Sequence, residues 1–291
     1  MNYRRITLGV ALAAALATGA CASYDARYRL VLAPDTKLAL DAIAVDAVLR
    51  NASETSDRPM VMFVHGRGNE PWKTIARDLL SGIESRYGVH VIMFNWDSFC
   101  VTCRPVDRAA DAAPDLATLM AAIAEARRNG VASNNKLILL THSMGSIVVQ
   151  SAATQGRLDP LPDNMFDAVI LASSDSDADG HAAWLGRLSR LSRSTYVTVN
   201  PHDWILALSG RDRRLGNRVP NGERAEWPVR YIVAASDEFR NHRLFNNDNL
   251  VGCASLKPIV DAAIKGDPVP LEDAGGVERA ADNVFVVSCE S

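Results

Sequence analysis

Ser143 stands between two apolar stretches in the segment NNKLILLTHSMGSIVVQ. The run from Leu137 to Leu140 is short and wholly apolar, which is typical of a strand buried on both faces. The apolar residues that follow Gly145 favour a helix packed on that strand. A sharp turn between such a strand and helix would expose the serine hydroxyl as a nucleophile. The alternative is a serine that only caps the helix.

A serine nucleophile needs a base to remove its proton, and three histidines follow Ser143 in the chain. His181 opens a predicted helix, and His202 directly precedes an aspartate. His242 lies beyond the apolar run VRYIVAAS, the last strand of the alternating pattern. The order nucleophile, acid, histidine therefore selects His242 as the base, and its alternative is a histidine of a surface loop.

The third member of such a site is an acid that orients the imidazole and stabilises its protonated form. Asp203 follows the predicted strand STYVTVN, which precedes the last strand, and it is the first choice. Asp175 and Asp177 follow the strand before that and are the alternatives. If they are not catalytic, they cap or order the loops around the site.

The elements that must position these residues alternate along the chain from Pro59 onward. Predicted strands are MVMFVHG, VHVIMFNW, KLILL, FDAVILAS, STYVTVN and VRYIVAAS, with helical segments between most of them. Asp107 to Asn129 predicts one long helix, and CASLKPIVDAAIKG predicts a closing helix. Strands separated by helices predict a doubly wound α/β fold, with a mostly parallel sheet and helices on both faces.

The same pattern sets the expected domain boundaries. We expect the α/β domain at residues 59–266, an N-terminal segment at 22–58 and a C-terminal tail at 267–291. The stretch KLALDAIAVDAVLRN is compatible with either a helix or an extra edge element. Residues 206–228 are polar, rich in arginine and broken by glycine and proline, which predicts a long surface excursion.

HSMG after a buried strand, with HG after an earlier one, resembles the α/β-hydrolase superfamily. Within it the chain is similar to a poorly characterised family of bacterial exported or membrane-associated esterase/lipase-like proteins, from about Pro59 to Gly266. One departure is Thr141, which stands where the Gly-x-Ser-x-Gly motif begins with glycine, and we expect strain there.

The resemblance implies a chemistry and further site residues. It implies an ester-cleaving serine hydrolase with an acyl-enzyme on Ser143, without a metal or organic cofactor. It implies an oxyanion hole formed by the backbone amides of Arg67 and Met144. His65, after the first strand, would support its loop and have no catalytic role. The alternative is a non-catalytic, lipid-anchored binding protein that retains the hydrolase fold.

The N-terminus predicts a targeting segment at residues 1–21. Arg4 and Arg5 precede an apolar stretch that is too short to span a membrane. The sequence ATGACAS that follows resembles a bacterial lipoprotein signal, cleaved before Cys21, whose thiol is then lipidated. The alternative is ordinary signal cleavage after Ala22. We therefore expect a lipoprotein of the bacterial cell envelope, or a periplasmic or secreted protein.

Export would place the other cysteines in an oxidising compartment. They are Cys100, Cys103, Cys253 and Cys289, an even number that predicts two disulfides with three possible pairings. We favour a local pair of Cys100 with Cys103, which leaves Cys253 with Cys289. A zinc site is less favoured because the second pair lacks close ligand spacing. The formal net charge of −3 gives no reason to expect a nucleic-acid partner, so the expected partners are a small ester or acyl substrate and the membrane.

Overall fold

A computed structural model describes most of the chain. The described residues are 30–32, 36–38, 40–68, 74–100, 103–209, 213–220, 223–234, 242, 253–272 and 274–288. Cys21, Cys289 and the predicted signal segment at residues 1–21 fall outside them.

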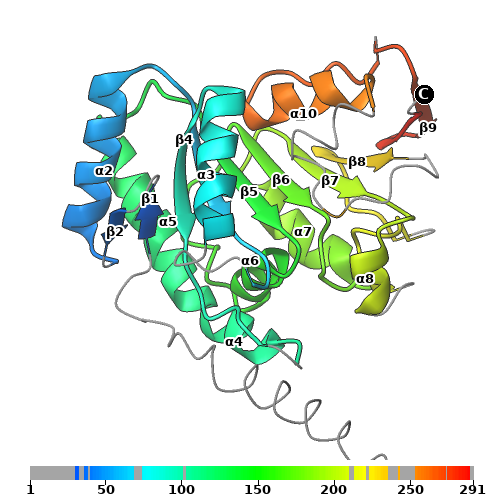
Figure 1. The fold of residues 1–291 in the computed structure, drawn as a ribbon, viewed down its shortest axis with the longest axis horizontal. Helices are drawn as coiled ribbons and strands as arrows, with labels where there is room; N and C mark the ends of the chain where they lie inside the picture. The colour runs from blue at the N-terminus through cyan, green and yellow to red at the C-terminus, as the bar shows by residue number, and fades with distance from the viewer. Residues whose placement is uncertain are drawn as a thin grey trace, which may run out of the picture.

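Within the described residues, ten strands form one sheet in the order β2-β1-β4-β3-β5-β6-β7-β8-β10-β9 (Figure 1). The strands are β1 (Leu30–Leu32), β2 (Thr36–Leu38), β3 (Met60–Val64), β4 (His90–Phe94), β5 (Leu137–His142), β6 (Ala168–Ala172), β7 (Thr195–Val199), β8 (Val229–Ala234), β9 (Val277–Ala281) and β10 (Val284–Val287). The strands from β4 to β10 in the sheet order run parallel, and antiparallel strands flank them. The predicted mostly parallel α/β fold is confirmed.

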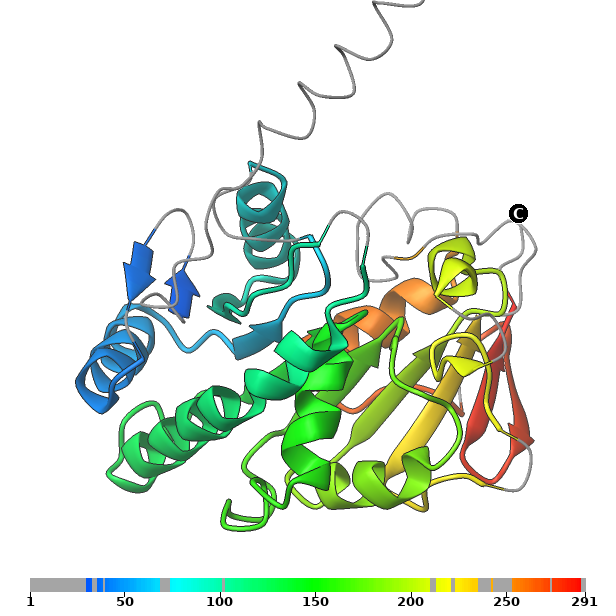
Figure 2. The same cartoon turned by 90° about the horizontal axis from the view of Figure 1, so that it is seen from below.

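Helices cover both faces of the sheet (Figure 2). They are α2 (Ala42–Thr55), α3 (Thr74–Tyr87), α4 (Val106–Asp111), α5 (Ala113–Arg128), α6 (Gly145–Thr154), α7 (His181–Ser189), α8 (Trp204–Leu208) and α10 (Leu256–Ile264). Side chains alternate along β3, so that Met60 and Met62 join the apolar cluster with α2, α5, α6 and α7, whereas Val61 and Phe63 join that with α3 and α10. Each central strand thereby contributes to both layers, which makes the sheet a rigid base for the loops at its edge.

The sheet is wider than the expected domain of residues 59–266. On one side β1 pairs antiparallel with β4, and on the other β10 pairs parallel with β8. Residues 267–291 were expected to be a tail, but they supply β9 and β10, and Phe285 and Val287 pack in the same apolar cluster as α10. The apolar run that forms β10 has four residues, which is too short for its periodicity to distinguish a strand from an irregular tail. The stretch KLALDAIAVDAVLRN was compatible with a helix or an edge element, and the structure has both there, the edge strand β2 and the helix α2.

The single helix expected from Asp107 to Asn129 is two helices, α4 and α5, which meet at Ala112. Pro114 lies in the first turn of α5. There its missing N–H needs no partner, whereas inside one continuous helix its ring would clash with the preceding turn. The proline therefore explains the break.

The carboxyl ends of the parallel strands gather the candidate residues at one edge. β5 ends at His142, β6 at Ala172 and β7 at Val199, so the loops that follow them lie at that edge of the sheet. Ligands and reacting groups collect at this edge in open α/β sheets. No helix among the described residues is both long enough and apolar enough to cross a membrane.

Candidate active site

Ser143 occupies a strained turn between β5 and α6. Its φ is +53°, in the left-handed region that residues with a side chain rarely adopt. Its amide donates to the carbonyl oxygen of Ala172 at 3.0 Å, which fixes the turn to the neighbouring strand β6. A strained backbone held by its surroundings is typical of functional sites, and here the strain falls on the candidate nucleophile itself.

Two glycines allow this turn to pack against the loop after β3. A Cβ atom on Gly145 would lie 2.2 Å from the carbonyl oxygen of Val64, and one on Gly66 would lie 2.8 Å from Cβ of Ser143. Neither distance is possible without displacing backbone. The glycine after the nucleophile and the glycine after the first strand are therefore both required by one close contact.

The strain expected at Thr141 does not appear in its backbone. Thr141 is a regular, fully buried residue of β5, paired with Val64 of β3 and Leu171 of β6. Its φ is not in the left-handed region, unlike that of Ser143. The crowding that favours glycine in this motif falls instead on Gly145, so threonine is accommodated.

The candidate base and acid are in contact. Nδ1 of His242 donates to Oδ2 of Asp203 at 2.7 Å. Asp203 is fully buried, and its Oδ1 accepts the backbone amides of Ile205 and Leu206 at 3.0 and 3.1 Å as the N-cap of α8. The helix terminus thus fixes the carboxylate, and the carboxylate fixes the imidazole.

His142 connects this pair to the nucleophile turn. Its Nε2 donates to the backbone carbonyl oxygen of His242 at 3.1 Å, and the two imidazole centroids are 4.8 Å apart. Because His142 directly precedes Ser143 in the chain, this contact places His242 beside the turn. Asp203 and His242 are therefore in contact, and His242 is bonded to His142, the residue that directly precedes Ser143.

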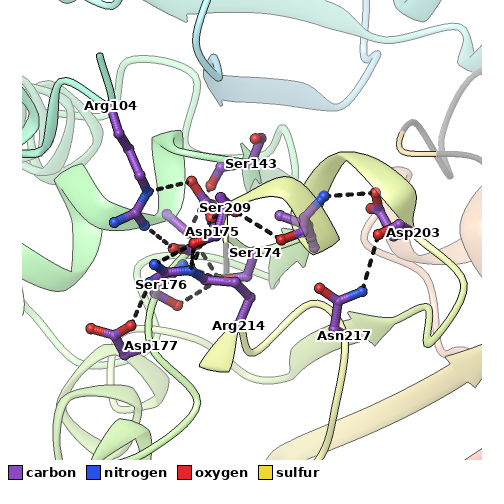
Figure 3. A network of polar contacts seen from close by, with 12 residues as sticks. Arg104, Ser143, Ser174, Asp175, Ser176, Asp177, Asp203, Ser209, Arg214 and Asn217 are labelled. Carbon is purple, nitrogen blue, oxygen red and sulfur yellow. Dashed lines mark hydrogen bonds and ion pairs between the residues drawn. The ribbon is translucent and has the colours of Figure 1, made fainter. Parts of the chain in front are cut away.

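The alternative acids bind arginines. Oδ2 of Asp175 accepts Nε of Arg104 at 3.0 Å, and its Oδ1 accepts the hydroxyl of Ser209 at 2.7 Å (Figure 3). Asp177 is mostly exposed and forms an ion pair with Arg214, whose Nε also lies 3.4 Å from Oδ1 of Asp175. Asp175 nevertheless contributes to the nucleophile turn, because its backbone amide donates to the carbonyl oxygen of Ser143 at 3.2 Å.

Buried hydroxyl groups support the same carbonyl. Ser146 donates through Oγ to the carbonyl oxygen of Ser143, and Ser174 donates to Oγ of Ser146 at 2.9 Å. The hydroxyl of Ser174 has one proton, so Ser176, at 2.6 Å from it, is the donor in their contact. Three hydroxyls thus form a chain of hydrogen bonds that ends at the backbone carbonyl oxygen of Ser143.

His65 has the supporting position expected for it. It is fully buried, its Nδ1 lies 2.8 Å from the carbonyl oxygen of Gly66, and its Nε2 lies 3.4 Å from the amide of Trp96. A carbonyl only accepts and an amide N–H only donates, so the proton belongs on Nδ1. The indole of Trp96 donates in return to the carbonyl oxygen of His65 at 2.7 Å. His65 and Trp96 therefore stabilise the loop after β3, which contains Arg67, a residue of the proposed oxyanion hole.

The cysteines divide as follows. Cys100 and Cys103 form a disulfide with each other, and Cys253 is also disulfide-bonded. The expected partner of Cys253, Cys289, lies outside the described residues. The local disulfide adjoins the site, because Nη1 of Arg67 donates to the carbonyl oxygen of Cys103 at 3.0 Å. Among the described residues, no group of three or more His, Cys, Asp or Glu side chains is placed to hold a metal ion.

Part of the segment expected as a surface excursion is buried in the site. Arg214 and Asn217 are almost fully buried, and the amide of Asn217 donates to the carbonyl oxygens of Asn200 and Asp203 at 3.0 and 3.3 Å. Burial, and next the nearby Arg104, lower the pKa of Arg214. One residue in the sequence of this segment that could have indicated burial is Gly216. A Cβ atom on it would lie 2.6 Å from the amide nitrogen of Ser174. Spacing alone does not show which partners such a residue meets.

Comparisons with known proteins agree with this fold. The model of the family described as alpha/beta hydrolase of unknown function (DUF900) matches residues 42–237, which include Ser143 and Asp203 and end before His242. A search of curated proteins finds no match.

Three solved structures illustrate the similarity. Carboxyl esterase 2 of the mycorrhizal fungus Tuber melanosporum is 13% identical, over 88% of this chain and 96% of that one, with a TM-score of 0.41. Esterase B of Lactobacillus rhamnosis is 12% identical, over 72% and 77%, with a TM-score of 0.40. An esterase of Pyrococcus furiosus is 12% identical, over 62% and 74%, with a TM-score of 0.36. The family match spans more than half of the sequence, and the chain belongs to this alpha/beta hydrolase family.

Proposed function

We propose that the protein is an exported serine hydrolase that cleaves a carboxylic ester through an acyl-enzyme on Ser143. The observation that carries the proposal is the 2.7 Å contact of His242 with the buried Asp203, beside the strained turn at Ser143. A structural histidine would not need a buried carboxylate that is itself fixed by a helix terminus. A base that must gain a proton during each turnover does, because the carboxylate stabilises the imidazolium.

The proposed reaction has two halves. His242 takes the proton of the Ser143 hydroxyl as its Oγ attacks the ester carbonyl, and the imidazolium then protonates the departing alcohol. In the second half His242 takes a proton from water, and the resulting hydroxide attacks the acyl-serine. The carboxylic acid leaves, and the proton returns to Oγ. Each step uses groups of the chain and water.

The developing negative charge would be stabilised by backbone amides. Met144 is the residue before the first turn of α6, so its amide lies at a helix N-terminus, where negative charge is favoured. Arg67 follows Gly66, which lies against Ser143, and its amide is the second proposed donor. Amides held by a rigid fold need little reorganisation during the reaction, which is why such sites are effective.

A fluorophosphonate probe tests the assignment, because it forms a covalent bond only with an activated serine. We expect labelling of the wild type and none of Ser143→Ala. Ser151→Ala, on the same helix α6, is the matched control and should label normally. His242→Ala should label far more slowly than His202→Ala, which removes an exposed histidine of the same region. A folded wild type that does not label would refute the proposal and favour the non-catalytic binding protein.

We also propose that the chain is anchored in the bacterial cell envelope by a lipid on Cys21. The support is the sequence ATGACAS after a short apolar segment. Radioactive palmitate supplied to an expressing bacterium should label the wild type and not Cys21→Ser. If labelling does not depend on Cys21, or if the mature N-terminus is Ser23, the protein is soluble after export.

A further inference from the structure

The helix that follows the candidate acid presents large apolar side chains to solvent. Trp204 is 57% exposed and Leu208 is 78% exposed. They are four residues apart on α8 and therefore share one face of the helix. Most other large apolar side chains of the described residues are buried, so this pair is a distinct surface feature. We call Trp204 and Leu208 the α8 face.

Contacts at both ends hold α8 at the site. Asp203, which binds His242, caps its N-terminus. Ser209, just past its C-terminus, donates to Asp175, whose amide reaches the carbonyl oxygen of Ser143. Figure 3 shows α8 lying between these two anchor points. Both ends of α8 are therefore linked, through Asp203 and Ser209, to residues of the candidate active site.

The N-terminal segment enters the sheet at the same edge. β1 runs antiparallel to β4, and Leu30 lies opposite Phe94, the last residue of β4. The described chain thus begins at the carboxyl edge of the parallel strands, where the site lies. Cys21 precedes Leu30 by nine positions, a length that reaches at most about 30 Å when fully extended.

The distance from β1 to α8 is similar to the length that the segment from Cys21 to Leu30 can reach. β1 and β7, which leads into α8, are separated by five strand spacings in the sheet, or about 24 Å. The segment between Cys21 and Leu30 is therefore long enough for the α8 face to reach a bilayer that holds a lipid on Cys21. Tethering raises the effective concentration of the α8 face at the bilayer, so a weak contact by two side chains is strengthened.

We propose that the α8 face docks on the lipid bilayer and that the substrate is an ester whose acyl chain is taken from that bilayer. This inference rests on the proposed function, both for the lipid on Cys21 and for ester hydrolysis. Tryptophan suits the docking role because its amphipathic ring favours the membrane–water interface. Leucine suits it because burial of an aliphatic side chain is favourable.

The chain contains a matched control for Trp204. Trp227 is 66% exposed, but it precedes the first residue of β8 and so lies at the opposite, amino edge of the strands. Its ring stacks with the guanidinium of Arg230 at 3.9 Å. Trp227 has the same residue type and a similar exposure but lies far from the proposed docking face. Comparing the two tryptophans therefore distinguishes a specific contact from nonspecific binding to lipid.

Fluorescence quenching by brominated lipid measures the docking directly. The full lipidated chain is reconstituted in vesicles of phosphatidylethanolamine and phosphatidylglycerol, with and without bromine on the acyl chains. We expect the wild type and Trp227→Phe to be quenched, and Trp204→Phe to lose most of the quenching. If Trp204→Phe is quenched as much as the wild type, or if Trp227→Phe alone abolishes quenching, the docking proposal is wrong. Absence of palmitate on Cys21 would remove the tether and refute it as well.

An activity comparison tests the substrate class. For each variant we take the ratio of turnover on a diacylglycerol in the vesicle to turnover on water-soluble p-nitrophenyl acetate. The double variant Trp204→Ser with Leu208→Ser should lower that ratio at least about tenfold, since burying one large apolar side chain is worth about that factor. Trp227→Ser should leave it unchanged. An unchanged ratio in the double variant contradicts the bilayer substrate. A wild type that cleaves neither ester and resists the fluorophosphonate probe refutes the hydrolase, while the quenching result still decides the docking.

Discussion

The hydroxyl of Ser146 donates a hydrogen bond of 2.7 Å to the carbonyl oxygen of Ser143. The same oxygen accepts the backbone amides of Ser146 and Asp175 at 3.1 and 3.2 Å. A trans peptide group is planar, and its C=O and N–H point in opposite directions. Three donors on this carbonyl therefore also fix the direction of the Met144 N–H, the proposed oxyanion donor.

Removing one of the three donors should loosen that amide. Ser146→Ala should lower kcat for ester hydrolysis by about tenfold, which is less than the roughly 10²–10³-fold loss seen when an oxyanion donor is removed outright. KM and the pH dependence should stay as in the wild type, because neither ester binding nor His242 is changed. Steady-state kinetics on p-nitrophenyl acetate measure all three quantities.

The same substitution has a cost in stability that must be separated from the effect on rate. One hydroxyl of the Ser174–Ser176 pair loses its acceptor inside the protein, which should lower the free energy of unfolding by about 1–3 kcal/mol. Ser146→Cys, which keeps a weak donor, should recover part of the rate, and Ser151→Ala should retain both rate and stability. A fall in stability without any change in kcat would show that the hydroxyl has only a structural role.

The choice between the acids is testable with one matched pair. Asp203→Asn keeps an N-cap for α8 but removes the charge that stabilises protonated His242, so kcat should fall by about 10³–10⁴-fold. Asp177→Asn changes a mostly exposed carboxylate on an arginine and should retain most of the activity. Circular dichroism should show that both variants fold. A larger loss in Asp177→Asn than in Asp203→Asn would contradict the assignment of the acid.

His142 should position the base through its contact with the backbone of His242. His142→Leu removes the Nε2 donor, and a displaced base should lower kcat by about 10- to 100-fold. His142→Gln keeps a donor and should recover part of that loss. Equal losses in the two variants would indicate that ring packing, and not the hydrogen bond, is what matters.

Sequence pattern predicted the centre of this fold because the central strands are mostly apolar and are followed by glycine or polar turns. The nucleophile turn was predictable for the same reason, since Ser143 and Gly145 are adjacent to β5. The edges of the sheet were harder. β10 is a run of four residues, and its partner β9 has mostly exposed side chains, so neither carries a clear periodicity.

The polar network around the site was not predictable from spacing. Arg104 and Asp175 are separated by 71 positions, and Asp203 and His242 by 39. The second pair could be inferred because catalysis requires a defined order of residue types. The first has no such rule, because an arginine buried against a carboxylate looks the same in sequence as one on the surface. Ser209 and Arg214 were missed for this reason.

The pH dependence of stability should depend on His181, which is fully buried. Its Nδ1 donates to the carbonyl oxygen of Ala178 at 2.6 Å, and its Nε2 contacts the hydroxyl of Tyr231 at the same distance. Burial is the main cause of the lowered pKa of His181, partly offset by the bond to Ala178, and burial also raises the pKa of Tyr231 to about 12. The imidazole is therefore neutral in the folded protein, and the tyrosine hydroxyl donates to it.

This arrangement should lose stability in acid. Below about pH 6.5 the unfolded chain binds a proton on His181 and the folded chain does not, so the free energy of unfolding decreases as the pH falls from there toward the lowered folded pKa. One such group gives a slope of at most about 1.4 kcal/mol per pH unit. His90, whose pKa burial also lowers, adds to it in the same direction. Urea unfolding between pH 8 and pH 5 should show a smaller slope for His181→Gln than for the wild type. His202→Gln, at an exposed position, should keep the wild-type slope, and equal slopes in all three proteins would contradict this role of His181.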